Sequence, residues 1–175
     1  APGTYHFDWD GEGAYQIGDS GKADVAGISS KKVNAYGFTA KAGYTFDVKM
    51  QPRVSLNGTY FSDNKDGRAF NRMFSDHEYS QFIDGTDLSN VWLVGAGVGA
   101  QVTESIGLRA DAKYFQAVQD FGTGDKNVGI EAGVSATYKY SEDLSFTAGY
   151  AHFFAGSGLE SGLRIVANGA QTIGG

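Results

Sequence analysis

Three acidic residues, Asp8, Asp10 and Glu12, stand at every second position near the start of the chain. Carboxylates bind divalent cations and transfer protons, so this cluster is the first candidate for chemistry. In an extended strand, residues two apart lie on one face, about 6.5 to 7 Å from each other. That separation is too large for a compact site around one ion. We therefore expect no metal site here, and the sequence predicts no other cofactor.

No combination of residues predicts catalysis. The histidines His6, His77 and His152 stand in three separate segments, and the chain contains no cysteine. No serine is spaced as a nucleophile beside any of them, although the members of a catalytic triad assemble in space rather than in sequence. The alternating glycines of residues 95–99 lack the strand-turn-helix context of a dinucleotide site. The sequence predicts that the protein is not an enzyme.

The element that must position the charged side chains is a long, two-sided strand. From Val128 to Tyr140, apolar or aromatic residues occupy every second position, with Gly, Ser, Thr, Glu and Lys between them. Successive side chains of a strand point to opposite faces, so this pattern gives one apolar face and one polar face. Residues 163–173 carry the pattern weakly. Seven segments carry it clearly, at about residues 4–17, 33–46, 53–61, 90–102, 105–115, 128–140 and 143–154.

Composition supports an all-β fold. The chain of 175 residues is 41% hydrophobic and 14% aromatic, with 26 Gly and 2 Pro. No apolar run approaches the roughly 18 residues of a membrane-spanning helix, which excludes a helical membrane protein. The formal net charge of −6 argues against a nucleic-acid partner, because phosphate binding normally requires a basic surface.

The links between the strands alternate in length. Residues 47–52, 103–105 and 141–143 are short links, whereas residues 18–32, 62–89 and 116–127 are long ones. In an antiparallel meander all short links lie at one rim, as in bacterial outer-membrane barrels. A soluble sandwich or lipocalin-like barrel would also have one apolar face, but most of these strands exceed its usual length of about 5 to 6 residues. The aromatic residues near the short-link rim would form an interfacial girdle: Tyr44, Phe46, Tyr138, Tyr140 and Phe146.

These observations predict one domain over residues 1–175, an antiparallel up-and-down transmembrane β-barrel whose polar face lines the interior. Charged side chains on that face would tune which solutes pass. Alternatively, opposite charges pair across neighbouring strands and brace or plug a narrow lumen, as Arg109, Asp111 and Lys113 would with Glu131 and Lys139. The full set of expected lumen residues is Asp8, Asp10, Glu12, Lys41, Arg53, Arg109, Asp111, Lys113, Glu131 and Lys139.

The long link at residues 62–89 is a second candidate for function. Structureless loops beyond about 12 to 15 residues are usually lids, binding loops or disordered segments. This one carries several aromatic residues among its charges, so we expect it to fold over the mouth or into the lumen, or to pack on a neighbouring chain. Its expected gate residues are Arg68, Phe70, Arg72, Phe74, His77 and Tyr79.

The same loop carries a family resemblance. Residues 60–74, the triplet His77-Glu78-Tyr79 and residues 87–90 together resemble the alginate-export family of outer-membrane porins. Residues 15–18 and 148–156 are similar as well, so the resemblance covers most of residues 4–156. It implies a large antiparallel barrel in the bacterial outer membrane that passes hydrophilic solutes. In the best-known member the solute is an anionic polysaccharide.

The end of the chain departs from that family pattern. Residues 162–175 are short, weakly patterned and lack the expected final strand with its terminal aromatic residue. We expect either the C-terminal part of a larger barrel, trimmed before its last strand, or a compact barrel of about eight strands closed by residues 163–173. Eight strands leave an interior that side chains nearly fill.

The leading functional hypothesis is an outer-membrane porin-like channel that contacts membrane lipid and passes hydrophilic solutes, with an anionic polysaccharide such as alginate as one candidate. The near balance of lumen charges fits neutral or mixed solutes at least as well. The alternative hypothesis is a small structural or adhesion barrel with a plugged lumen that binds through its long loops. These patterns carry no signal for an oligomeric state.

Overall fold

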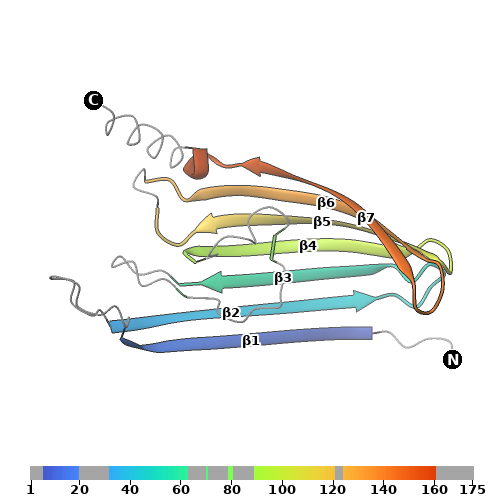
Figure 1. Ribbon diagram of the computed structural model, residues 1–175, viewed down its shortest axis with the longest axis horizontal. Coiled ribbons are helices and arrows are strands. Elements are labelled where there is room, and N and C mark those ends of the chain that lie inside the picture. Colours follow the sequence, from blue (N-terminus) through green and yellow to red (C-terminus); the bar gives the residue numbers. More distant parts are fainter. Residues whose placement is uncertain are drawn as a thin grey trace.

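The computed structural model shows one antiparallel β-sheet (Figure 1). The structure describes residues 6–19, 32–62, 70, 79–80, 89–120 and 124–160. Within these residues the sheet has seven strands in the order β1-β2-β3-β4-β5-β6-β7. Their bounds are β1 His6–Asp19, β2 Lys32–Thr45, β3 Arg53–Phe61, β4 Val91–Gln101, β5 Ile106–Ala117, β6 Asn127–Lys139 and β7 Ser145–Ala155. Every bound lies within two residues of the sequence-based expectation.

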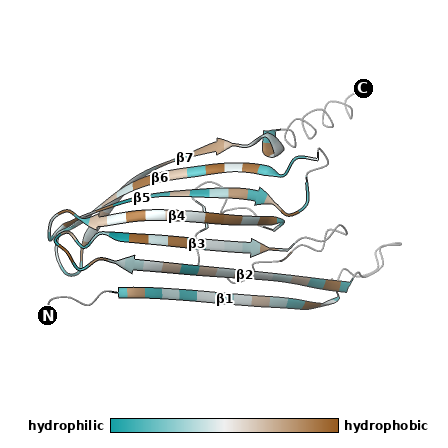
Figure 2. Ribbon diagram, turned by 180° about the vertical axis from the view of Figure 1, so that it is seen from behind, coloured by the Kyte–Doolittle hydropathy of each residue, from teal (hydrophilic) through white to brown (hydrophobic). Residues whose placement is uncertain are grey.

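Apolar and polar residues alternate along the strands (Figure 2). Because successive side chains of a strand point to opposite sides, this alternation divides the sheet into two faces. We call the face that carries Phe38, Leu56, Val94 and Val134 the outer face. The large side chains of this face are exposed, and Leu56 and Val134 have relative exposures of 62% and 56%. The opposite, inner face carries the charged and hydroxyl side chains. The apolar face of this sheet is therefore uncovered within the described residues.

The strands form an up-and-down meander in which each strand pairs with its sequence neighbours. The links β2–β3, β4–β5 and β6–β7 gather at one end of the sheet, which we call the short-turn end (Figure 1). The opposite end is the long-loop end. The predicted all-β, antiparallel up-and-down architecture is confirmed.

The sheet is open within the described residues, with β1 and β7 as its edge strands. The expectation of a barrel closed by residues 163–173 concerns residues outside the described part of the chain. None of the helices in the described ranges combines the length and the apolar character needed to cross a bilayer.

A small apolar core lies on the inner face at the long-loop end. Its centre is Phe115 and Leu93, with relative exposures of 0% and 2%. Phe153 and Val33 pack against its margin. The buried members are Ala35, Phe61, Phe70, Tyr79, Val91, Leu93, Phe115, Ala117 and Val128. The inner face is thus apolar at this end and polar over the rest of its length.

The placement of Val128 corrects one expectation. The alternation in residues 128–140 assigns Val128 to the outer face, but the structure buries it in the inner core. The reason is a β-bulge between Phe115 and Gln116, which shifts the register of β5 against β6. Phe115 pairs with Gly129 and Gln116 with Asn127, so Val128 is the extra residue of the bulge on β6. Beside it, Gly129 has φ 144°, a conformation that favours glycine.

Candidate functional site

The ten charged residues predicted for the lumen all occupy inner-face positions of the sheet. Five are acidic and five are basic, so their formal charges cancel. They come from five of the seven described strands, and the ladder register fixes which of them are neighbours. The set is Asp8, Asp10, Glu12, Lys41, Arg53, Arg109, Asp111, Lys113, Glu131 and Lys139.

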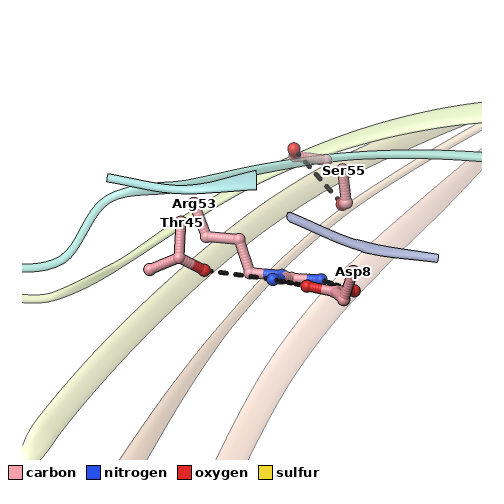
Figure 3. A network of polar contacts seen from close by, with 5 residues as sticks. Asp8, Thr45, Arg53 and Ser55 are labelled. Atoms are coloured by element: carbon pink, nitrogen blue, oxygen red, sulfur yellow. Dashed lines mark hydrogen bonds and ion pairs between the residues drawn. The ribbon is translucent and has the colours of Figure 1, made fainter. Parts of the chain in front are cut away.

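The ion pair nearest the short-turn end joins β1 and β3 across β2 (Figure 3). The Arg53 guanidinium donates from Nη1 to Oδ2 of Asp8 at 2.6 Å and from Nη2 to Oδ1 at 2.7 Å. Nη1 also donates to the Thr45 hydroxyl at 3.0 Å. The guanidinium lies directly over Gly43 of β2, where any added Cβ would overlap it. Glycine at this position is what lets the arginine reach across the intervening strand.

The second ion pair is buried. Lys113 of β5 and Glu131 of β6 face each other in the ladder, and Nζ of Lys113 lies 3.3 Å from Oε1 of Glu131. The Glu131 side chain is only 1% exposed. Its other carboxylate oxygen, Oε2, accepts a hydrogen bond from the Ser80 hydroxyl at 2.5 Å. A residue of the long loop therefore contacts the sheet through a carboxylate in the middle of β6.

The third pair lies along a single strand. Nε of Arg109 is 3.5 Å from Oδ1 of Asp111, and the Arg109 side chain remains 62% exposed. The pairing of Lys113 with Glu131 is the cross-strand contact that the alternative hypothesis expects, whereas Arg109 bonds within its own strand instead of to β6. Lys41 and Lys139 are exposed on the inner face.

Hydroxyl groups and glycines fill the space between the charges. The Thr39 and Thr59 hydroxyls hydrogen-bond at 2.9 Å in a buried contact, and a similar bond of 3.0 Å joins Thr137 and Thr147. On β4, Gly95 lies between the side chains of Asn57 and Lys113. Hydroxyl groups of this kind offer hydrogen-bond donors and acceptors to water and hydrophilic solutes.

The long loop contacts the inner face at its apolar end. The rings of Phe70 and Tyr79 lie 5.3 Å from the ring of Phe61, stacked in the first case and edge-on in the second. Four other predicted gate residues lie outside the described part of the chain: Arg68, Arg72, Phe74 and His77.

Sequence reasoning missed the part of the inner face that this loop contacts. Ser80 was not singled out, and the inner face was expected to be polar throughout. A signal for this part does exist, because Phe61, Leu93 and Phe115 are apolar residues at inner-face positions, all near the long-loop end. Such breaks in the alternation mark where another segment covers a face.

The remaining candidate residues that the structure describes do not come together as one site. Within the described ranges, no group of three or more His, Asp or Glu residues is arranged to hold a metal ion. The acidic series Asp8, Asp10 and Glu12 is spread along β1, and its first member bonds Arg53. His152 lies on the outer face of β7, with its ring 4.4 Å from that of Phe154.

Long antiparallel strands with short links at one end, an exposed apolar face and a polar face of paired charges are typical of the wall of a membrane β-barrel. The sequence matches the profile of the family described as Alginate export over residues 1–168. The chain belongs to this family, which is a family of outer-membrane transport proteins. No curated protein matches the sequence.

Proposed function

We propose that this chain forms part of the wall of a passive outer-membrane conduit. Its inner face is the surface along which hydrophilic solutes pass. The observation that carries the proposal is the contrast between the two faces. Large apolar side chains are exposed on the outer face, while the inner face presents paired charges, hydroxyls and glycines. A barrel wall between lipid and water requires this arrangement.

A conduit also requires that the edges of β1 and β7 be paired. Unpaired backbone N–H and C=O groups in hydrocarbon cost several kcal/mol each, roughly, so spanning sheets close on themselves. The proposal therefore includes pairing of both edges with further strands. The barrel diameter grows with the number of strands, and barrels of about 16 to 18 strands leave an aqueous channel.

The solute that the inner face favours is one with mixed or no charge. Equal numbers of acidic and basic residues line the described face, and three of the basic groups already contact carboxylates. Export of alginate is what the family implies. Because alginate is a polyanion, its passage along this wall relies on the exposed cations Arg109, Lys41 and Lys139, which we propose as the selectivity residues of the described region.

Reconstitution of the full chain in a planar bilayer tests the pore. We expect discrete conductance steps. Replacing Arg109, Lys41 and Lys139 by glutamine should shift the ion selectivity of the channel toward cations. A protein that inserts in the bilayer but gives no conductance step would contradict the pore while leaving the fold intact.

The seated loop supports a second candidate function. Phe70, Tyr79 and Ser80 all contact the inner face, so the loop occupies space in which solute would move. A barrel plugged in this way would act in adhesion or structure and bind partners through its exposed loops. Deletion of residues 64–86 distinguishes the two: the conduit predicts larger conductance steps, whereas the plugged barrel predicts loss of partner binding with folding intact.

A further inference from the structure

From the outer-face residues we infer the position and height of the lipid boundary: the wall fits a hydrocarbon layer about 23 Å thick, bounded by two aromatic belts that cross the strands obliquely. This inference rests on the proposed function, since it assigns the outer face to lipid. It adds the depth of each residue and the tilt of the strands.

The belt at the long-loop end carries one aromatic residue or more on most strands. Tyr36 and Tyr60 stack at 5.7 Å between ring centroids, and Phe38 and Tyr60 at 5.5 Å. Trp92 meets Tyr114 edge-on at 5.8 Å. In strand order the members are Tyr15, Tyr36 with Phe38, Tyr60, Trp92, Tyr114 and Phe154, with Ile130 in the corresponding place on β6.

The belt at the short-turn end contains the five predicted girdle residues and Phe7. Phe7 pairs with Tyr44 on one side of the sheet, and Tyr138 pairs with Phe146 on the other. Phe46 and Tyr140 follow directly after the ends of their strands. Between the two belts the outer face is mostly alanine, glycine, valine and leucine. Two belts with an aliphatic zone between them are typical of side chains at the two interfaces of a bilayer.

The spacing of the belts is the same on the four strands that carry members of both, β1, β2, β6 and β7. Eight residues separate Phe7 from Tyr15, Tyr36 from Tyr44, Ile130 from Tyr138, and Phe146 from Phe154. At about 3.3 Å per residue, this corresponds to about 26 Å along each strand. A constant spacing on strands at both sides of the sheet is what two parallel boundaries produce.

The ladder register gives the tilt. The row of paired residues through Tyr44 reaches β7 at Tyr150, four residues from Phe146. The row through Phe154 reaches β2 at Ala40, four residues from Tyr36. Between β2 and β7, which are five strand spacings apart, each belt is therefore displaced by four residues along the strands relative to the row of paired residues.

The equal displacement of the two belts gives the tilt of the strands, and the tilt gives the thickness of the hydrocarbon layer from the distance between the belts. Four residues along the strand, about 13 Å, against five spacings of about 4.8 Å correspond to strands tilted by roughly 30° from the bilayer normal. The projection of 26 Å at this tilt is about 23 Å, close to the apolar band of about 25 Å on outer-membrane barrels. The midplane crosses β6 at Val134, midway between Ile130 and Tyr138.

The two tryptophans report this geometry. Trp92 belongs to the long-loop belt, about 11 Å from the midplane, whereas Trp9 is two residues inside the opposite boundary, about 6 Å from the midplane. Depth-dependent quenching measures the difference, with the full chain in phosphatidylcholine vesicles whose acyl chains carry bromine near the headgroup, at mid-chain or near the terminal methyl. We expect Trp9→Phe, which retains Trp92, to lose most fluorescence with bromine near the headgroup. Trp92→Phe should lose most with deeper bromine.

A matched pair of substitutions provides the control in a chain that lacks both native tryptophans. Val134→Trp places an indole on the outer face at the midplane, and Ser135→Trp places one at the next residue on the inner face. We expect the deepest bromine to quench Val134→Trp and no bromine to quench Ser135→Trp appreciably.

Equal depths for Trp9 and Trp92, or a Trp92 deeper than Trp9, would overturn the inferred boundary. Absence of quenching at Val134→Trp would also overturn it, because a second protein copy would then cover the outer face. Conductance measured on the same preparations separates the two proposals. Correct depths without conductance contradict only the conduit, and conductance with wrong depths contradicts only the boundary.

Discussion

The buried pair of Lys113 and Glu131 makes the sharpest prediction about what holds the long loop to the sheet. Replacing Lys113 by methionine keeps most of the side-chain volume and removes one group that compensates the Glu131 carboxylate. Breaking a buried ion pair from one side typically costs about 3 to 5 kcal/mol. Lys113 is 15% exposed and the Ser80 hydroxyl still donates to Glu131, so we expect the lower end, about 3 kcal/mol.

Urea unfolding of the full chain in lipid vesicles, followed by tryptophan fluorescence, measures this loss. Glu131→Gln should cost less, about 1 to 2 kcal/mol, because a neutral amide still accepts from Ser80. The combination of Lys113→Met with Glu131→Leu should cost less than the sum of the single changes, since a charge is no longer buried alone.

The matched control is Lys139→Met, which removes an exposed cation from the same inner face and should change the free energy of unfolding by no more than about 0.5 kcal/mol. If Lys113→Met were as mild as Lys139→Met, Glu131 would not be a buried, compensated carboxylate. Full additivity of the two substitutions in the pair would refute the reasoning as well.

Two further predictions concern other contacts. Gly43→Ala should displace the Arg53 guanidinium and cost at most about 1 kcal/mol, because the pair with Asp8 is partly exposed; Asp8→Asn should then add almost nothing, and full additivity would contradict this. Outside the strands, the backbone N–H of Asn127 lowers the pKa of Asp125 below its ordinary value of 3.8. The ionised Asp125 carboxylate therefore stabilises the fold above that value, and this stabilisation is lost as the pH falls below it. The difference in unfolding free energy between the native chain and Asp125→Asn should then vanish in acid. A difference that persists in strong acid would disprove it.

Much of this fold follows from the sequence because a strand with one apolar face and one polar face has a period of two. That period locates β2 and β3 almost to the residue and places Arg53 and Lys113 on the same face. It carries no information on what covers a face. The core around Phe115 therefore needed the structure, since it depends on a loop that returns from a distant part of the chain.

The ion pairs show a related limit. Lys113 and Glu131 are direct ladder neighbours, so register alone brings them together. Arg53 and Asp8 lie on strands that do not pair with each other, and their contact depends on the small residue between them, Gly43. A pattern within one strand does not reveal which glycine clears a path across the sheet.

The most direct test of the central proposal is chemical access to the inner face during conduction. The chain contains no cysteine, so Ser135→Cys and Val134→Cys each introduce a single thiol, on the inner and outer faces respectively. A charged, membrane-impermeant thiol reagent is then added to an open channel in a planar bilayer. We predict that the reagent lowers the conductance of Ser135→Cys and leaves that of Val134→Cys unchanged. An unchanged conductance for Ser135→Cys, or an equal decrease for both variants, would contradict a solute path along the inner face.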